Sequence, residues 1–194
     1  MLEGILSPAF LQAAGNGQKF AGMRLFATAK NPTIGTVYCD GVMTVTSIAN
    51  GQKKVVTYSD LDGESLQIQA DALTMIKIEG NLTGEWKINS PDFGKISVKN
   101  TALESLDCSS CSALQELNVS TNTALTSLNC TNCRKVESIS TIATNSTVAT
   151  NIAALITANA VLAGTVYVNS EDTYYSTIET AAQGAGWTIA PLPA

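Results

Sequence analysis

From Leu73 onward, apolar residues occur in pairs two positions apart, and the pairs repeat every ten or eleven residues. Alternate side chains of a β-strand point to the same face, so each pair indicates one short strand with an apolar inner face. A fixed period means that every unit makes the same turn and stacks on the unit before it. The pattern predicts an inner ladder whose first positions are Ile76, Trp86, Ile96, Leu106, Leu117, Leu128 and Ile139, and whose second positions include Cys108, Val119 and Cys130.

Three consecutive units share the spacing Leu-x-x-Leu-x-Cys/Val-x-x-Cys/Asn, beginning at Leu103, Leu114 and Leu125. This spacing is typical of leucine-rich repeats, and two units together make a coil of about 20–22 residues with a strand on each side. We therefore predict a leucine-rich-repeat solenoid over residues 63–142.

The flanking regions follow other patterns. Over residues 36–62, alternating β-formers are interrupted by Asp40-Gly41 and Asn50-Gly51, which are hairpin signals, and they predict a β-meander. Residues 143–194 predict a helix-strand-helix-strand cap, with Asn145 as the first N-cap and Gly164 at the end of the first helix. Residues 1–35 are apolar but lack a helical or strand period, so we expect them to dock on a partner.

The segment from Asn100 to Cys133 resembles a leucine-rich repeat family common in surface proteins of Bacteroidetes, and similar repeats occur in phage and prophage proteins of those bacteria. The resemblance implies a binding or structural scaffold and supplies no catalytic residues. Cys111 and Cys133 stand where the family usually has Asn. The expected fold class is thus a β-rich leucine-rich-repeat solenoid with an N-terminal β-meander and a C-terminal α/β cap.

Composition removes several classes of function. The 194-residue chain has a net charge of −5 with only eleven Lys and Arg, which argues against a nucleic-acid partner. It contains no His, so the commonest general base is missing and we expect no enzyme; a small hydrolase that uses Asp and Glu is a minor alternative. No uncharged apolar run is long enough to span a bilayer, and residues 1–8 do not have the form of a secretory signal.

The four cysteines of the repeat region allow three interpretations. Cys108-x-x-Cys111 and Cys130-x-x-Cys133 have the spacing of a four-thiolate zinc site. Both pairs also occupy equivalent repeat positions, which favours buried ladder residues that behave as small hydrophobes. A disulfide is the third reading. We expect the ladder, and no metal or cofactor.

The predicted function is that of a non-enzymatic structural or adhesion protein. We expect a phage virion component, such as a capsid- or tail-attached fibre or decoration protein, that contacts other virion proteins or copies of itself through its N-terminal segment. The alternative is a secreted bacterial cell-surface protein that binds a host protein or glycan on its strand face. Tyr174 and Tyr175 form a possible contact patch.

Overall fold

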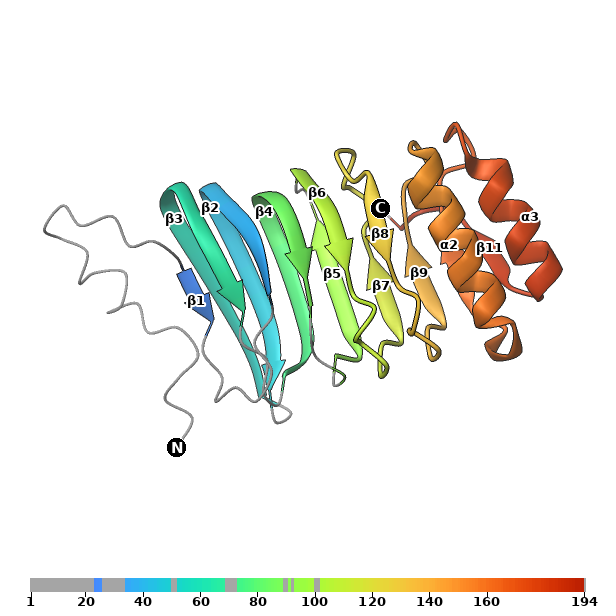
Figure 1. The fold of residues 1–194 in the computed structure, drawn as a ribbon, viewed down its shortest axis with the longest axis horizontal. Helices are drawn as coiled ribbons and strands as arrows, with labels where there is room; N and C mark the ends of the chain where they lie inside the picture. The colour runs from blue at the N-terminus through green and yellow to red at the C-terminus, as the bar shows by residue number, and fades with distance from the viewer. Residues whose placement is uncertain are drawn as a thin grey trace, which may run out of the picture.

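The computed structural model describes residues 23–25, 34–49, 52–68, 73–88, 91, 93–99 and 102–193. Within these residues, eleven strands join in one hydrogen-bonded network, and two α-helices follow near the C-terminal end (Figure 1). The elements are β1 (Met23–Leu25), β2 (Ile34–Ala49), β3 (Gln52–Ile68), β4 (Leu73–Lys87), β5 (Lys95–Lys99), β6 (Ala102–Asp107), β7 (Glu116–Asn118), β8 (Ser127–Asn129), β9 (Ser138–Ser140), α2 (Ser146–Ala158), the 3-10 helix η1 (Ala160–Leu162), β10 (Thr165–Tyr167), α3 (Tyr175–Ala185) and β11 (Thr188–Ala190).

The N-terminal part of the sheet is built from long antiparallel strands. β2 lies between β3 and β4, and the pairing Ala49↔Gln52 leaves only residues 50–51 to connect β2 with β3. A two-residue Asn-Gly connection is the hairpin that the sequence predicted there. β1 pairs in parallel with β3, so residues 23–25 of the expected docking segment add a strand to this sheet. The rest of that segment up to residue 33 lies outside the described residues.

The other predicted hairpin turn, at Asp40-Gly41, is wrong. Both residues lie inside β2, where the register with β3 shifts between Cys39 and Asp40 and again between Gly41 and Met43. Gly and Asp favour a bulge as readily as a turn, because both tolerate irregular backbone angles. The sequence therefore marked an irregularity of the strand and not its end.

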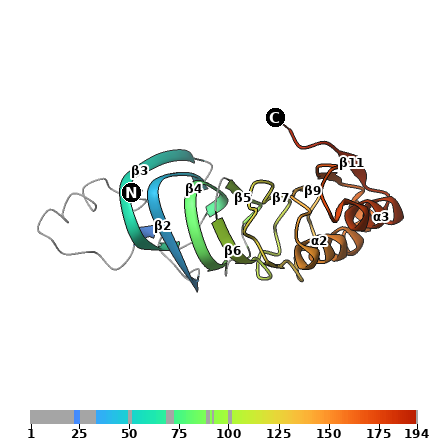
Figure 2. The same cartoon turned by 90° about the horizontal axis from the view of Figure 1, so that it is seen from above.

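Two runs of parallel strands make up the rest of the network: a five-stranded run that begins at β5 beside β4, and a three-stranded run that begins with β4 itself. The first half of β4 pairs with β5 in the register Ile76↔Ile96, and its second half pairs with β6 in the register Trp86↔Leu106. The first run then continues through β7, β9, β10 and β11, and the second continues through β8. Figure 2 shows β5, β7 and β9 on one side and β6 with α2 on the other.

These runs correct the expected fold class. The chain is α/β-like, with parallel runs of three and five strands and two helices, and the predicted β-rich leucine-rich-repeat solenoid with a separate α/β cap is wrong. β10 pairs with β9 and β11 pairs with β10, so the C-terminal strands extend the five-stranded run. Apolar spacing indicates which side chains share a face, but it does not show which later strands join the same sheet.

Helix α2 occupies the place beside β8, at the end of the three-stranded run. Asn145 caps the helix, because its side-chain oxygen accepts hydrogen bonds from the N–H groups of Thr147 and Val148. The side-chain amide of Asn151 donates to the Leu128 carbonyl at 2.7 Å and so satisfies a backbone group of β8. Asn159 is buried and donates to the carbonyls of Cys133 and Leu155, each at 2.9 Å. Asn151 thus occupies a hydrogen-bonding position that a further strand would fill, and Asn159 ties the end of the helix to the segment after β8.

Candidate binding surface

The outward side chains of the five-stranded parallel run form two rows. Ile96, Leu117, Ile139 and Val166 are buried and in register, so the residues on either side of each point outward. Neighbouring strands place equivalent side chains roughly 4.8 Å apart. We call these ten outward residues the strand face; its first row is Lys95, Glu116, Ser138, Thr165 and Thr188, and its second row is Ser97, Asn118, Ser140, Tyr167 and Ala190.

Neutral hydrogen-bonding groups dominate the strand face. Six of its residues carry a hydroxyl group and one carries an amide, whereas its two charged residues, Lys95 and Glu116, form an ion pair with each other. Both charged side chains are 47% exposed, so the pair adds little stability and mainly cancels charge. Ser97 and Ser140 are buried, whereas the other eight residues of the strand face are at least partly exposed.

A turn holds one amide of the face in place. The side-chain oxygen of Asn118 accepts hydrogen bonds from the N–H of Ser120 at 3.1 Å and from its hydroxyl at 2.9 Å. Asn129 makes the equivalent pair of bonds with Thr131 after β8. These bonds orient each amide so that its NH₂ group is left to other partners.

The predicted inner ladder is distributed over both parallel runs. Trp86, Leu106 and Leu128 are register partners in the three-stranded run, and all three are buried. Cys108, Val119 and Cys130 are buried one position after their strands. Ile76 pairs with Ile96, although its own side chain lies outside the described set. The ladder residues whose side chains are described therefore belong to the core.

The four cysteines of the repeat region lie close together inside this core. The Sγ atoms of Cys108 and Cys130 are 3.5 Å apart. The Cys133 thiol donates to the Cys108 carbonyl at 3.1 Å, and the Cys111 thiol donates to the Ile88 carbonyl at 3.8 Å. Asn122 makes the same kind of bond to the Val98 carbonyl at 3.2 Å, so Cys and Asn serve the same backbone role at this repeat position.

The cysteine cluster does not have the arrangement of a metal site. Among the described residues, no three His, Cys, Asp or Glu side chains are placed to hold one ion. The hydrogen bonds to Cys130 and Cys133, together with burial, raise the pKa of Cys108 well above its usual range.

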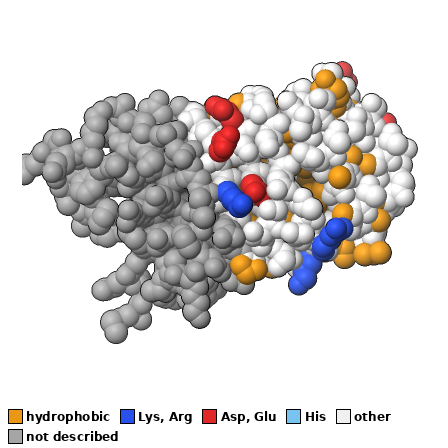
Figure 3. Space-filling view, in the orientation of Figure 1, with side chains coloured by type: hydrophobic (Ala, Val, Ile, Leu, Met, Phe, Trp, Pro, Cys, Tyr) orange, Lys and Arg blue, Asp and Glu red, His pale blue; other side chains and the backbone are white. Residues whose placement is uncertain are grey.

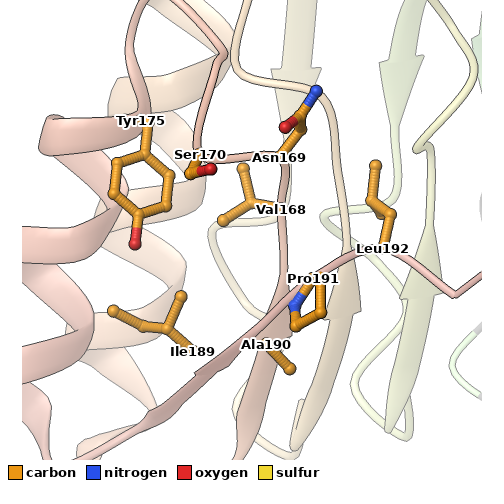
Figure 4. A pocket seen from close by; sticks show the side chains of 8 residues that line it. All are labelled: Val168, Asn169, Ser170, Tyr175, Ile189, Ala190, Pro191 and Leu192. Atoms are coloured by element: carbon orange, nitrogen blue, oxygen red, sulfur yellow. The ribbon is translucent and has the colours of Figure 1, made fainter.

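Tyr174 and Tyr175 lie where α3 begins and are half-buried against the core. Tyr174 also donates its backbone N–H to the Ala143 carbonyl, and Tyr175 lines a groove. The Tyr175 hydroxyl bonds to Glu179 at 3.3 Å. The groove, of about 450 Å³, lies beyond the ends of β10 and β11 (Figure 4); its lining is Val168, Asn169, Ser170, Tyr175, Ile189, Ala190, Pro191 and Leu192.

Sequence reasoning missed this groove and the amide contacts of Asn151 and Asn159. No pattern could reveal the groove, because residues 189–192 meet residues 168–170 only after β11 joins the sheet. Asn151 carries a weak signal, since Asn is unfavourable inside a helix and needs a local reason to be there, whereas Asn159 lies at the C-cap of α2.

Strong charge is absent from the face shown in Figure 3. The acidic and basic side chains of the described residues form only a few small groups there, and near the middle a basic group lies beside an acidic one. Two ion pairs, Lys77–Glu79 and Lys87–Asp107, further reduce the free charge on the strands. Scattered and paired charges create only a weak field, so this face is poorly suited to a polyanion.

Within the part of the chain that the structure describes, no helix is both long and apolar enough to cross a membrane. Comparison of the chain with protein-family models, curated proteins and solved structures found no match.

Proposed function

We propose that this protein is a non-enzymatic structural or adhesion protein that binds another macromolecule through its strand face. The observation that carries the proposal is the pair of in-register rows over β5, β7, β9, β10 and β11, in which hydroxyl and amide groups predominate. Such rows offer hydrogen-bond donors and acceptors at a regular spacing.

The side chains of the face suit binding because most are short. Ser and Thr lose little rotamer freedom when a partner covers them, so ordering them costs less free energy than ordering long charged side chains. Tyr167 adds a larger flat surface with a polar end, and aromatic residues of this kind are common at binding surfaces. A polar polymer with many hydroxyl groups, or a polar protein surface, matches this chemistry.

The placement of the titratable groups supports binding over catalysis. The chain contains no His, and Glu116 on the strand face is held by Lys95. In the groove, Tyr175 is the one titratable residue of the lining, and its hydroxyl bonds to Glu179. Burial and the adjacent Glu179 carboxylate raise the pKa of Tyr175, which opposes its use as a base near neutral pH.

We further propose that the protein is part of a phage virion, as a fibre or decoration protein on the capsid or tail. Residues 1–35 would then contact other virion proteins or further copies of this chain. The alternative is a bacterial cell-surface protein that uses the same face to bind a host protein or glycan. Both versions use the strand face, and they differ in location and in partner.

Location distinguishes the two versions. If the virion version is right, phage particles released from a lysed culture of the source organism should carry the protein in a fixed ratio to the capsid protein. Quantitative mass spectrometry of the particles, purified as a density-gradient band, measures this ratio. Immunogold labelling should decorate the same particles. Labelling of intact cells without labelled particles would contradict the virion version and favour the cell-surface one.

A further inference from the structure

We propose that Cys108 and Cys130 form a reactive thiol pair, which a small-molecule disulfide converts into an intramolecular disulfide. The two residues follow β6 and β8, directly after the register partners Asp107 and Asn129. Neighbouring strands lie about 4.8 Å apart, which falls within the Cα separations of about 4.4–6.8 Å that disulfides span.

The sulfur positions select this pair. The Cys108 and Cys130 Sγ atoms are already in contact at 3.5 Å, and a small side-chain rotation brings them to the S–S bond length of about 2.05 Å. The Cys133 thiol is directed instead to the Cys108 carbonyl, and the Cys111 thiol to the Ile88 carbonyl. Oxidation of Cys111 or Cys133 would remove a hydrogen bond from a buried carbonyl, which costs free energy.

A groove provides access to one member of the pair. Cys108 is fully buried, but Cys130 is 8% exposed and lines a groove of about 210 Å³ between β8 and α2. Arg134 lies on the same groove and is exposed. Its guanidinium group favours an oxidant that carries carboxylates, such as oxidised glutathione.

The reaction is a balanced thiol–disulfide exchange in two steps. The Cys130 thiolate attacks one sulfur of the small disulfide, releases one small thiol and forms a mixed disulfide. The Cys108 thiolate then attacks the Cys130 sulfur, and the second small thiol leaves. Two protein S–H bonds and one external S–S bond are lost, one protein S–S bond forms, and the two protons pass to the released thiols.

Acid–base properties make this exchange slow at neutral pH. The hydrogen bond from Cys108 acts to lower the pKa of Cys130, but the hydrogen bond with Cys133 and burial outweigh it and raise this pKa well above the usual range. Only the thiolate reacts, so its population and the initial rate should grow about tenfold for each pH unit until the solution pH approaches the raised pKa. An exposed thiol would reach its plateau earlier.

The test uses the folded full-length chain and oxidised glutathione. We expect the free thiol count to fall by two, no glutathione to stay bound to the four cysteines of the repeat region, and peptide mapping to find a Cys108–Cys130 link. In the Cys108→Ser variant, the second step is blocked, so Cys130 should retain one glutathione. In Cys130→Ser, neither residue should react. Cys111→Ser should form the link like the parent chain. Cys133→Ser should form the same link at a different rate, because the hydrogen bond with Cys133 contributes to the raised pKa of Cys130.

Circular dichroism verifies that each variant is folded, and Cys108→Ala replaces Cys108→Ser if the serine variant unfolds. A link between other cysteines, a stable mixed disulfide on Cys108 or Cys130 in the parent chain, or no loss of thiols from these two residues after prolonged treatment at pH 9 would each overturn the proposal.

Discussion

Replacing Leu117 with Ala should lower the free energy of unfolding by about 2–5 kcal/mol, the range for a large-to-small change in a packed core. Leu117 is 1% exposed and lies in register between Ile96 and Ile139 in the five-stranded run. Its neighbours are held by strand hydrogen bonds on both sides, so they cannot collapse fully into the space left by the side chain. The measurement is equilibrium unfolding in urea, with circular dichroism as the probe.

Gln115→Ala is the matched control, because Gln115 is exposed two positions earlier on the same segment. A surface substitution of this kind changes stability by about 0.5 kcal/mol or less. If Leu117→Ala were equally mild, the inward direction of Leu117 and the register of the run would both be wrong.

Replacing Gly164 with Ala should also destabilise the protein, by about 1–3 kcal/mol or more, because the added methyl group has no space. A Cβ atom on Gly164 would lie 2.8 Å from the Glu137 carbonyl carbon and 2.9 Å from its Cα, closer than real side chains approach backbone. The backbone cannot easily withdraw. Thr165 N–H donates to the Glu137 carbonyl at 2.8 Å, and the Gly164 carbonyl accepts from Thr188 N–H at 2.9 Å.

Gly184→Ala adds the same methyl group but should stabilise the protein. Gly184 lies in α3 and is exposed, and a Cβ atom added there would have no other atom within 4 Å. Alanine is a better helix former, so this variant should gain about 0.5–1 kcal/mol. Thermal melts of the two variants should move in opposite directions, and equal shifts would contradict the close approach of residues 137 and 164.

The sequence carried much information about local structure. The i, i+2 apolar pairs mark the inner side of each short strand, as at Leu106 and Cys108, because strand side chains alternate. Asn145 and the Asn50-Gly51 dipeptide are signals that act through nearby backbone, so they could be read without the fold. The fold class could not be read from the sequence in this way, because the pairing of β10 with β9 depends on contacts between distant segments.

The candidate surface was only partly predictable for the same reason. Strand alternation indicates that Ser138 and Thr165 point outward, but only the pairing of β9 with β10 makes them neighbours on one face. The two tyrosines lie together in sequence, but the groove that Tyr175 lines forms only when β11 joins the sheet. The contact of Cys108 with Cys130 follows from the repeat register, whereas the groove beside Cys130 arises from the position of α2.

The most direct test of binding through the strand face compares Ser138→Arg with Ser127→Arg. Each serine is the first residue of a three-residue strand, but Ser138 belongs to the strand face and Ser127 to the other run. Binding of the parent chain and both variants is measured by biolayer interferometry against bacterial surface polysaccharides, intact cells and purified phage particles.

We predict that the parent chain binds at least one of these targets without altering it chemically. Ser138→Arg should weaken this binding at least about tenfold, which corresponds to about 1.4 kcal/mol, and Ser127→Arg should leave it unchanged. Turnover of a target, equal affinities of Ser138→Arg and the parent chain, or absence of binding to all three targets would contradict binding through the strand face.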